Sequence, residues 1–448
     1  MKIRPANGIR GELKLPGDKS ISHRAAIISA FSLGSARISN FSTSLDCMAT
    51  LNCLRDLGVK IEVDGANVVI EGVGLEGLRA SSKPLDCGNS GSTMRLLAGV
   101  LAAYQFGSTI TGDASLRSRP MKRIIEPLEL MGARISSDEG RAPLRIEGRR
   151  KLKAISYRMA VDSAQVKSCI LLAGLNTKGR TQVIERPGAT RDHTERMLRW
   201  LGVPVSVEAV ENDGAPLQAV SVEGRAQFNA HRGTVPGDIS SAAFFIAAAA
   251  LLPGSKLKIK DVGMNPTRTR MLPLLRSLGA DIRVESVKSD ASLAWQDFDE
   301  PFGDILISGG AGLAPTGPQP SNVFSGDVIS QVIDELPMLA VLGSQVIGGI
   351  SIRDAAELRL KESDRIRATV ENLRAMGVNV EEHDDGLTIR ERSPLRGAKL
   401  DAHDDHRIAM AFTIAALAAE GESDLTGAEC VGVSFPEFFD LLETVVER

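Results

Sequence analysis

One phrase recurs five times along this chain and constrains the fold more than any other feature. Each copy reads as the end of an amphipathic helix, a glycine and an alternating strand. The copies are LRDLGVKIEV at 54–63, LELMGARISS at 128–137, LRWLGVPVSV at 198–207, LRSLGADIRV at 275–284 and LRAMGVNVEE at 373–382. Glycine adopts a positive φ without steric cost, so each one is predicted to stop its helix in a left-handed turn.

A second helix, rich in Ala, Leu and Ile, precedes each phrase and also opens a sixth copy. These helices are predicted to begin near Ser20, Gly91, Ser163, Ile239, Asp334 and His406. The starts recur roughly every 72 to 75 residues, except where an insertion at about 285–333, rich in Gly, Pro and Ser, lengthens one interval. The sixth copy closes with a helix over 438–446 that has no strand after it. Because the helices are apolar nearly all round, we expect them to be buried beneath sheets.

The length and the repeat together predict two similar α/β domains of three units each. A chain of 448 residues with 43% hydrophobic and 24% charged residues is too long for one ordinary core. We place the hinge in the stretch Gly-Thr-Val-Pro-Gly-Asp at 233–238. The first domain is then 1–16 with 236–448, and the second is 17–235. The strand from Gly8 to Leu15 is expected to pair with the second half of the chain.

Composition excludes several classes of function. A net charge of −3 and only 4% aromatic residues give no basis for binding nucleic acid or an anionic membrane. The longest apolar run, 242–253, is too short to span a bilayer, and the first residues lack the apolar core of an export signal. The five cysteines are scattered without metal spacing, which indicates reduced thiols in a cytosol. The run Gly17-Asp18-Lys19-Ser20 lacks the spacing of a P-loop. The match to the dinucleotide fingerprint at 72–77 is followed by a loop instead of a helix.

Cations stand at the predicted starts of the buried helices, where acids are the rule because of the helix dipole. Those that break this rule are Lys19, Arg24, Arg95 and Arg407. Free N–H groups and added cations at a helix N-terminus form a binding site for phosphate or carboxylate. For the small polar residues at these starts, ordinary helix capping is the favoured interpretation. They are Thr93, Ser240, Ser241 and Asp404.

Two loops add further charge. The stretch 112–120 carries Arg117 and Arg119, and LKESDR at 360–365 opens a helix with two cations flanking two acids. In isolation LKESDR favours a surface ion-pair network. Taken with the helix starts, the sequence predicts a cleft between two domains, lined by roughly seven Lys and Arg, for ligands with several anionic groups. Asp334 and Glu362 are acids among these cations, which makes them candidates for proton transfer.

Nine ordered motifs between Leu15 and Glu443 resemble those of one known family. They are LPGDKSISHR, GNSGSTMR, GDASLRSRPM, SAQVKSCILLAGL, TRDHTERM, VPGDISSAAFF, LKESDR, DHRIAMAF and SFPEFF. Together they resemble the EPSP synthase (3-phosphoshikimate 1-carboxyvinyltransferase) family. The sequences of these motifs are more similar to the bacterial branch noted for tolerance to glyphosate than to the commoner bacterial and plant branch.

The resemblance implies a fold, a reaction and a setting. The fold would be two domains, each of three βαβαββ units around a pseudo-threefold axis, with the active site in the interdomain cleft. The enolpyruvyl group of phosphoenolpyruvate would pass to the 5-hydroxyl of shikimate 3-phosphate through a tetrahedral ketal, releasing phosphate. This is a step of the shikimate pathway of aromatic amino acid biosynthesis. No cofactor and no metal are implied, and the enzyme would be a cytoplasmic monomer.

Carried over position by position, the resemblance also implies roles for individual residues. The contacts to shikimate 3-phosphate match Lys19, Ser20, Arg24, Ser163, Ala164, Gln165, Arg191, Asp334 and Lys361. The phosphoenolpyruvate contacts match Lys19, Gly91, Arg119, Gln165, Arg365 and Arg407. In catalysis, Asp334 would take the 5-hydroxyl proton, Glu362 would move a proton at the methylene carbon, and Lys19 would bridge the two substrates.

Two positions depart from the family pattern. Val433 stands where many members have a lysine, so one phosphate contact is missing or replaced. Gly91 stands where an alanine of the tolerant type crowds glyphosate, so we expect less tolerance than the overall wording suggests.

Two other interpretations fit the sequence less well. The sister transferase that acts on UDP-N-acetylglucosamine usually carries a catalytic Cys in a loop, but residues 104–120 contain none. A non-catalytic binder of anionic metabolites would gain nothing from Asp334 and Glu362 beside its ligand.

Overall fold

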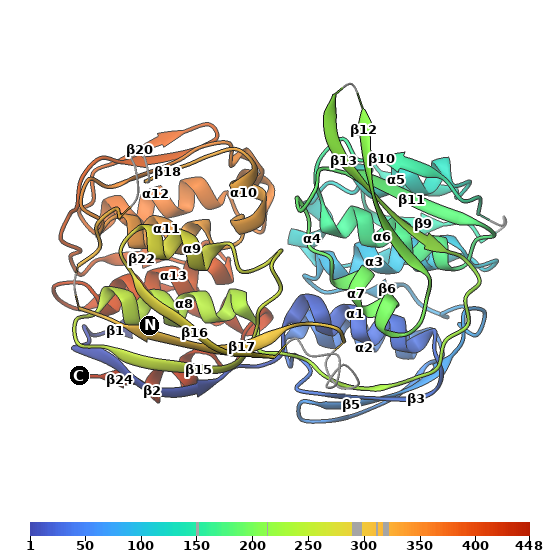
Figure 1. The fold of residues 1–448 in the computed structure, drawn as a ribbon, viewed down its shortest axis with the longest axis horizontal. Coiled ribbons are helices and arrows are strands. Elements are labelled where there is room, and N and C mark those ends of the chain that lie inside the picture. The colour runs from blue at the N-terminus through green and yellow to red at the C-terminus, as the bar shows by residue number, and fades with distance from the viewer. Residues whose placement is uncertain (149–151, 213, 289–297, 311, 317–321) are drawn as a thin grey trace. The chain divides into compact units, whose positions relative to one another are not determined.

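The computed structural model describes residues 1–148, 152–212, 214–288, 298–310, 312–316 and 322–448. It divides into two compact units, each with its own hydrophobic core (Figure 1). Unit 1 comprises Met1–Pro16, Pro236–Lys288 and Pro301–Arg448; unit 2 comprises Gly17–Val235 and Ser289–Glu300. Parts of the insertion expected at about 285–333 lie outside the described residues.

Residues 298–300 belong to unit 2, whereas the sequence predicts them in the domain that holds 236–448. The Phe298 ring packs on that of Trp200 with centroids 5.1 Å apart. Glu300 Oε1 lies 2.6 Å from His193 Nδ1, and both side chains are buried. Apolar burial and this polar contact therefore hold the segment in unit 2.

Three buried helices form the centre of unit 2. They are α1 (Lys19–Ala30), α3 (Gly91–Ala102) and α6 (Ala164–Leu175), and α3 packs against both others. The helices that carry the recurrent phrase lie outside them and are less completely buried; these are α2 (Leu45–Asp56), α5 (Lys122–Leu130) and α7 (His193–Trp200). A short helix that we did not expect, α4 (Ala114–Ser118), forms in the loop at 112–120 because the Asp113 carboxylate caps it.

Three four-stranded sheets of one topology complete unit 2. Their orders are β14-β3-β5-β4, β6-β7-β9-β8 and β10-β11-β13-β12, and in each the first pair is parallel and the others antiparallel. The strands are β3 (Leu33–Ser39), β4 (Lys60–Asp64), β5 (Asn67–Val73), β6 (Leu85–Asp86), β7 (Ser108–Thr111), β8 (Ile135–Asp138), β9 (Arg141–Ile146), β10 (Ser156–Arg158), β11 (Arg180–Glu185), β12 (Val205–Asn212), β13 (Ala215–Glu223) and β14 (Arg232–Thr234).

Unit 1 repeats this plan around α8 (Ile239–Leu251), α11 (Leu336–Gly343) and α13 (His406–Leu417), which pack on one another (Figure 1). Its other helices are α9 (Met271–Ser277), α10 (Asp327–Val332), α12 (Arg365–Ala375), α14 (Phe438–Glu443) and the 3₁₀ turns η1 (Ala356–Leu360) and η2 (Ala428–Val433). The sheets have the orders β16-β17-β15-β2-β24, β18-β19-β21-β20 and β1-β23-β22. The strands are β1 (Lys2–Ile3), β2 (Gly8–Lys14), β15 (Lys256–Gly263), β16 (Asp281–Lys288), β17 (Phe302–Ser308), β18 (Val323–Phe324), β19 (Ile350–Ile352), β20 (Val380–His383), β21 (Gly386–Ile389), β22 (Lys399–Asp401), β23 (Ser423–Thr426) and β24 (Val446–Glu447).

The N-terminal strand pairs with the second half of the chain, as predicted. Strand β2 runs parallel to β15, with Arg10 opposite Lys256 and Lys14 opposite Lys260. The closing helix α14 is shorter than predicted and is followed by the two-residue strand β24, which pairs with the other edge of β2.

The recurrent phrase has the predicted geometry. Its glycines, Gly58, Gly132, Gly202, Gly279 and Gly377, have φ values of 90°, 104°, 80°, 91° and 90°. Each one ends a helix and turns the chain into a strand, and a side chain there would be strained.

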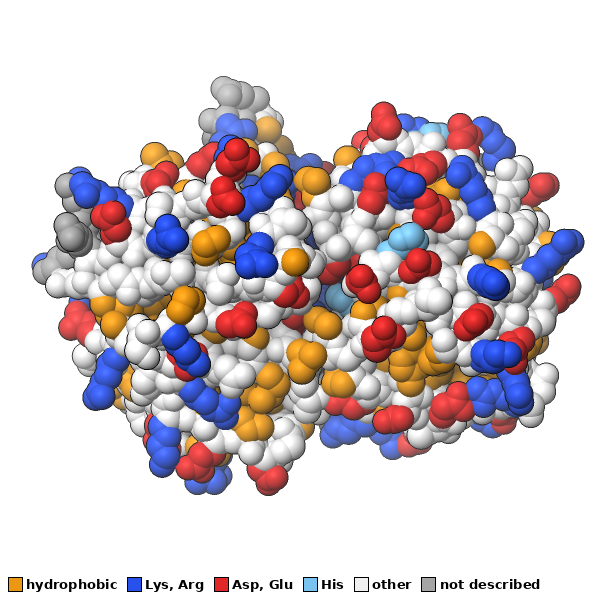
Figure 2. Space-filling view, turned by 180° about the vertical axis from the view of Figure 1, so that it is seen from behind, with side chains coloured by type: hydrophobic (Ala, Val, Ile, Leu, Met, Phe, Trp, Pro, Cys, Tyr) orange, Lys and Arg blue, Asp and Glu red, His pale blue; other side chains and the backbone are white. Residues whose placement is uncertain are grey.

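Three further observations concern surface charge, membrane-spanning helices and metal-binding side chains. Acidic and basic side chains lie interspersed over the face drawn in Figure 2, so neither sign of charge dominates that face. Throughout the described part of the chain, the helices are too short or too polar to cross a lipid bilayer. The same residues contain no group of three or more His, Cys, Asp and Glu side chains that could hold a metal ion.

Candidate active site

At the start of α1, Lys19 is held by a carboxylate that sequence reasoning missed. Asp18 caps the helix, its Oδ1 accepting from the Ile21 N–H at 2.9 Å. The Lys19 ammonium donates to Asp46 Oδ2 at 2.8 Å, and its side chain stays 20% exposed. Asp46 lies in the first turn of α2, where an acid is the ordinary partner of the helix dipole. Its position in sequence therefore gave no signal that it would orient Lys19.

One turn further along α1, Arg24 is almost fully buried, with 3% of its surface exposed. Its Nε donates to Thr194 Oγ1 and its Nη2 to Ser168 Oγ, both at 2.8 Å. Its Nη1 donates to the Ser20 carbonyl oxygen, also at 2.8 Å. All three acceptors are neutral. Burial lowers the pKa of Arg24 to about 10, and the nearby Arg191 guanidinium acts in the same direction.

The start of α3 brings together side chains from three parts of unit 2. Arg95 Nη1 donates to Gln165 Oε1 at 2.8 Å, and Gln165 Nε2 donates to Ser92 Oγ at 2.9 Å. Arg119 Nη2 donates to Asn89 Oδ1 at 2.6 Å. A Cβ added at Gly91 would lie 2.6 Å from Arg95 Nη1 and 3.5 Å from Arg119 Nη1.

At α6, Ser163 caps the helix and Ala164 is its first residue. Lys167, in the first turn of this helix, is completely buried. Its ammonium donates to Glu185 Oε1 at 2.8 Å and Glu195 Oε1 at 2.6 Å. Burial alone would lower the pKa of Lys167, but the two carboxylates outweigh it and hold the pKa above its usual value.

In unit 1 the two predicted catalytic acids lie beside the same cation. Asp334 Oδ1 is 3.5 Å from both Lys361 Nζ and Arg365 Nη1. Glu362 Oε2 accepts from Arg365 Nη2 at 2.6 Å. The structure therefore gathers four of the predicted site residues, Asp334, Lys361, Glu362 and Arg365, into one cluster.

Arg365 shows that the interpretation of LKESDR as a surface network was wrong, because only 2% of this residue is exposed. Its Nε and Nη2 donate to the two carboxylate oxygens of Asp405 at 2.7 and 3.2 Å. Burial alone would lower the pKa of Arg365, but Asp405 and Glu362 outweigh it and raise the pKa. Burial would raise the pKa of Asp405, and Arg365 lowers it below its usual value of 3.8.

Arg407, at the start of α13, contacts a hydroxyl, a carbonyl and a carboxylate. Its Nη1 donates to Ser240 Oγ at 2.7 Å and to the Asp334 carbonyl oxygen at 3.0 Å, and it lies 3.5 Å from Glu335 Oε1. The hydroxyl of Ser240 in turn donates to Glu335.

The expected capping roles at three of these helix starts were wrong by one to three residues. Asp238 caps α8 in place of Ser240, Asp405 caps α13 in place of Asp404, and Ser90 caps α3 in place of Thr93. In each case the residue earlier or later in the same polar run has the extended backbone that an N-cap requires.

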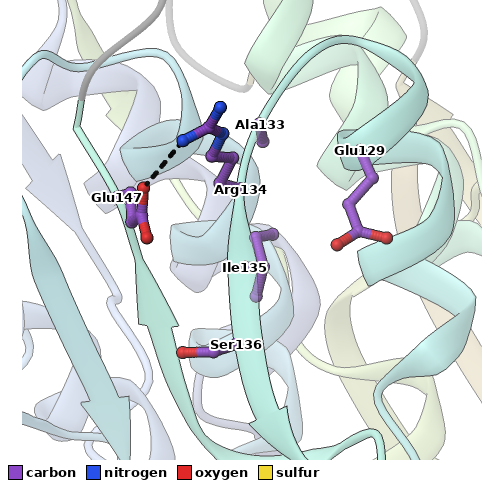
Figure 3. Close-up of a pocket in the computed structure, with 6 residues that line it drawn as sticks. All are labelled: Glu129, Ala133, Arg134, Ile135, Ser136 and Glu147. Carbon is purple, nitrogen blue, oxygen red and sulfur yellow. Dashed lines mark ion pairs between the residues drawn. The ribbon is translucent and has the colours of Figure 1, made fainter.

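A surface pocket of about 340 Å³ also lies in unit 2, between α5 and the strands β8 and β9 (Figure 3). Its lining includes Arg134 and Glu147, whose charged groups are 3.7 Å apart. None of its lining residues belongs to the predicted site.

Comparison with known proteins gives a consistent result over the whole chain. The family model described as EPSP synthase (3-phosphoshikimate 1-carboxyvinyltransferase) matches residues 3–442. The 3-phosphoshikimate 1-carboxyvinyltransferases of Koribacter versatilis and Solibacter usitatus are 48% and 47% identical, covering 100% of this chain and 99% of each relative.

Solved structures agree with these relatives. The EPSP synthase of Acinetobacter baumannii superposes with a TM-score of 0.83 at 40% identity, covering 99% of this chain and 98% of that one. The enolpyruvyl transferase NikO of Streptomyces tendae covers 100% and 97%, with a TM-score of 0.75 at 18% identity, a likeness of fold alone.

Proposed function

The chain belongs to the EPSP synthase family and transfers the enolpyruvyl group of phosphoenolpyruvate to shikimate 3-phosphate in the shikimate pathway; we propose that the 5-hydroxyl of shikimate 3-phosphate is the acceptor and that both units supply substrate contacts. The two units are proposed to be the two domains of the family fold. The reaction is addition followed by elimination. Protonation of the methylene makes the adjacent carbon cationic, the 5-oxygen attacks it to give a tetrahedral ketal, and loss of phosphate restores the double bond.

Unit 2 is proposed to hold most of the negative charge of the substrates. Arg24, with its neutral acceptors, and the nearby Arg191 would bind shikimate 3-phosphate together with Ser20, Ser163 and Ala164. Arg119 and the N–H of Gly91, at the start of α3, would bind phosphoenolpyruvate. Lys19 and Gln165 would contact both substrates, since each is oriented by a polar neighbour, Asp46 and Arg95.

Unit 1 is proposed to move the protons. Asp334 would take the 5-hydroxyl proton of shikimate 3-phosphate as the 5-oxygen attacks. Lys361, beside Asp334, would contact the same substrate. Glu362 would deliver and then remove a proton at the methylene carbon, while Arg365 and Arg407 hold the charge that shifts onto phosphate. These steps need no redox change and no group carrier, so the proposed reaction runs without a cofactor.

The observation that carries this proposal is the clustering of Asp334 and Glu362 on the buried Arg365, in a chain that matches the family from end to end. A binder of anions would place its cations without two acids between them. We further propose that the enzyme works as a monomer in the cytoplasm.

The test measures phosphate release with both substrates. Asp334→Ala is expected to lower kcat by about 10²- to 10⁴-fold, the usual cost of removing a general base, with a smaller change in both KM values. Asp440→Ala, at an exposed carboxylate of α14, is the matched control and should keep wild-type rates. No release by the wild type with shikimate 3-phosphate, or release with UDP-N-acetylglucosamine in its place, would refute the proposal.

A further inference from the structure

Two hydroxyl groups accept hydrogen bonds along one edge of the Arg24 guanidinium. Nε and Nη2 lie on the same side of that group, and they donate to Thr194 Oγ1 and Ser168 Oγ. The two hydroxyl oxygens are themselves hydrogen-bonded at 2.7 Å. Two oxygens so close together present Arg24 with the geometry that the two oxygens of a carboxylate usually provide. Ser168 and Thr194 come from α6 and α7, and both are completely buried.

Two buried carboxylates of this region are bound to another cation, and two more act on Arg24 only at longer range: Asp18 caps α1 and Glu300 contacts His193. Glu185 and Glu195, both buried, accept from the Lys167 ammonium. Glu185 also accepts from the hydroxyl of Thr190 at 2.6 Å and from Gln218 at 2.8 Å. Glu195 acts on Arg24 only at longer range, by raising its pKa against the effect of burial. Within the described residues, Arg24 therefore makes hydrogen bonds but no ion pair.

The guanidinium keeps donors to spare. Arginine has five N–H donors, and the three hydrogen bonds to Thr194, Ser168 and the Ser20 carbonyl use three of them. Two N–H groups remain, on Nη1 and Nη2. A buried cation with spare donors and no ion pair is suited to bind an anion. The attraction between the two charges is strong because little water surrounds them.

We propose that Ser168 and Thr194 are positioning residues for substrate binding: as a neutral substitute for a carboxylate, they fix the orientation of Arg24 without forming an ion pair, so that its charge can attract shikimate 3-phosphate. This inference rests on the proposed contact between Arg24 and that substrate. A carboxylate at the same place would hold Arg24 more firmly but would also cancel much of its attraction for the anion. Lys167 supports the arrangement by keeping Glu185 and Glu195 away from the guanidinium.

The first test removes a hydroxyl without changing the shape of the side chain. Thr194→Val should weaken binding of shikimate 3-phosphate, measured by calorimetry, by about tenfold, the loss expected for one hydrogen bond to a charged group. The KM of phosphoenolpyruvate should change little. Thr194→Ser keeps the hydroxyl and should restore most of the affinity, which a role in packing alone would not explain. Equal affinities for wild type and Thr194→Val would overturn the proposal.

The second test separates orientation from charge. Ser168→Asp places a carboxylate beside Arg24, so its affinity for shikimate 3-phosphate should fall further than that of Thr194→Val, by more than about tenfold. Unchanged or tighter binding would show that orientation alone matters and would overturn the proposal. Thermal unfolding checks that each variant is folded, and if Ser168→Asp does not fold, Thr194→Val and Thr194→Ser decide.

Arg24→Ala distinguishes failure of this inference from failure of the proposed function. If it leaves the affinity for shikimate 3-phosphate unchanged, the proposed contact of Arg24 is wrong and the inference falls with it. If it weakens binding while Thr194→Val and Ser168→Asp do not, only the inference is wrong.

Discussion

Arg24 in unit 2 and Arg365 in unit 1 are buried to the same degree but are held by opposite chemistry. Each is gripped along the edge formed by Nε and Nη2, Arg24 by the hydroxyls of Thr194 and Ser168, and Arg365 by the carboxylate of Asp405. The pKa values diverge accordingly. Burial lowers that of Arg24 to about 10, whereas the carboxylates around Arg365 outweigh burial and raise its pKa.

The difference shows that a buried arginine at a helix start can serve two purposes. Arg365 carries three carboxylates, those of Asp405, Glu362 and Asp334, so most of its charge is already compensated before a substrate arrives. Its structural effect is to gather the two proposed catalytic acids. Arg24 gathers no acid and keeps its charge. Unit 2 thus suits the binding of anions, and unit 1 suits the movement of protons among charged groups.

The largest effect should come from breaking the ion pair of Arg365. Asp405→Asn leaves a buried guanidinium without its main partner, and the free energy of unfolding should fall by about 3–5 kcal/mol, as measured by denaturation in urea. The exposed pair of Arg367 and Glu371 is the matched control, at 2.7 Å in the same helix. Glu371→Gln should cost about 1 kcal/mol or less, because solvent screens an exposed pair.

The acid range checks the cause of that loss. The pKa of Asp405 is lower in the folded chain than its usual 3.8, so its stabilising contribution is fully present above pH 3.8 and is lost as the pH falls through the folded pKa. The gap in stability between wild type and Asp405→Asn should therefore be constant at neutral pH and shrink below about pH 4. A gap that is independent of pH down to acid unfolding would show that packing, and not the ion pair, causes the loss.

The sequence predicted the repeated elements of both units well, for a physical reason. The turn glycines and the buried helices each follow from a local rule, and the cations at helix starts stand out because they break one. The repeat lets each copy be compared with the others. The predicted starts at Gly91, Ile239 and His406 coincide with those of α3, α8 and α13. Where the polar run offered two or three possible caps, the choice depended on the backbone of a single residue and could not be read from the pattern.

What the sequence could not predict is which neutral or acidic side chain would meet each cation. Ser168 and Thr194 lie 144 and 170 residues from Arg24. In sequence both are small polar residues of helices, with no pattern to pair them. Asp46 and Asp405 resembled ordinary acids at helix starts. These pairings depend on how α1, α6 and α7, or α12 and α13, pack together, which periodicity does not specify.

A smaller effect is expected at Gly91, where neutral oxygens again orient cations of unit 2. A methyl group there would lie 2.6 Å from Arg95 Nη1, which Gln165 Oε1 holds at 2.8 Å, so Gly91→Ala should displace the arginine. Overpacking of this kind costs about 1–3 kcal/mol, and we expect the KM of phosphoenolpyruvate to rise by about tenfold. The resemblance implies that an alanine at this position crowds glyphosate in the tolerant branch, so we expect the inhibition constant of glyphosate to rise as well. An unchanged inhibition constant would refute the expectation that Gly91 makes this enzyme sensitive.

The smallest effect is expected where unit 1 uses a hydroxyl. Ser240 accepts from Arg407 Nη1 at 2.7 Å, but Arg407 also has the Asp334 carbonyl oxygen at 3.0 Å and the Glu335 carboxylate at 3.5 Å. Ser240→Ala removes one of the three contacts that orient Arg407. The KM of phosphoenolpyruvate should therefore rise by about threefold, which is the low end of the range for the loss of one hydrogen bond. Steady-state kinetics of Ser240→Ala beside Thr194→Val make the comparison direct, since each removes one hydroxyl from an arginine. Ser240→Ala could instead raise the KM of phosphoenolpyruvate by the same factor as Thr194→Val lowers the affinity for shikimate 3-phosphate. A nearby carboxylate would then not compensate for the lost hydroxyl, and the contrast between the two units would have no energetic basis.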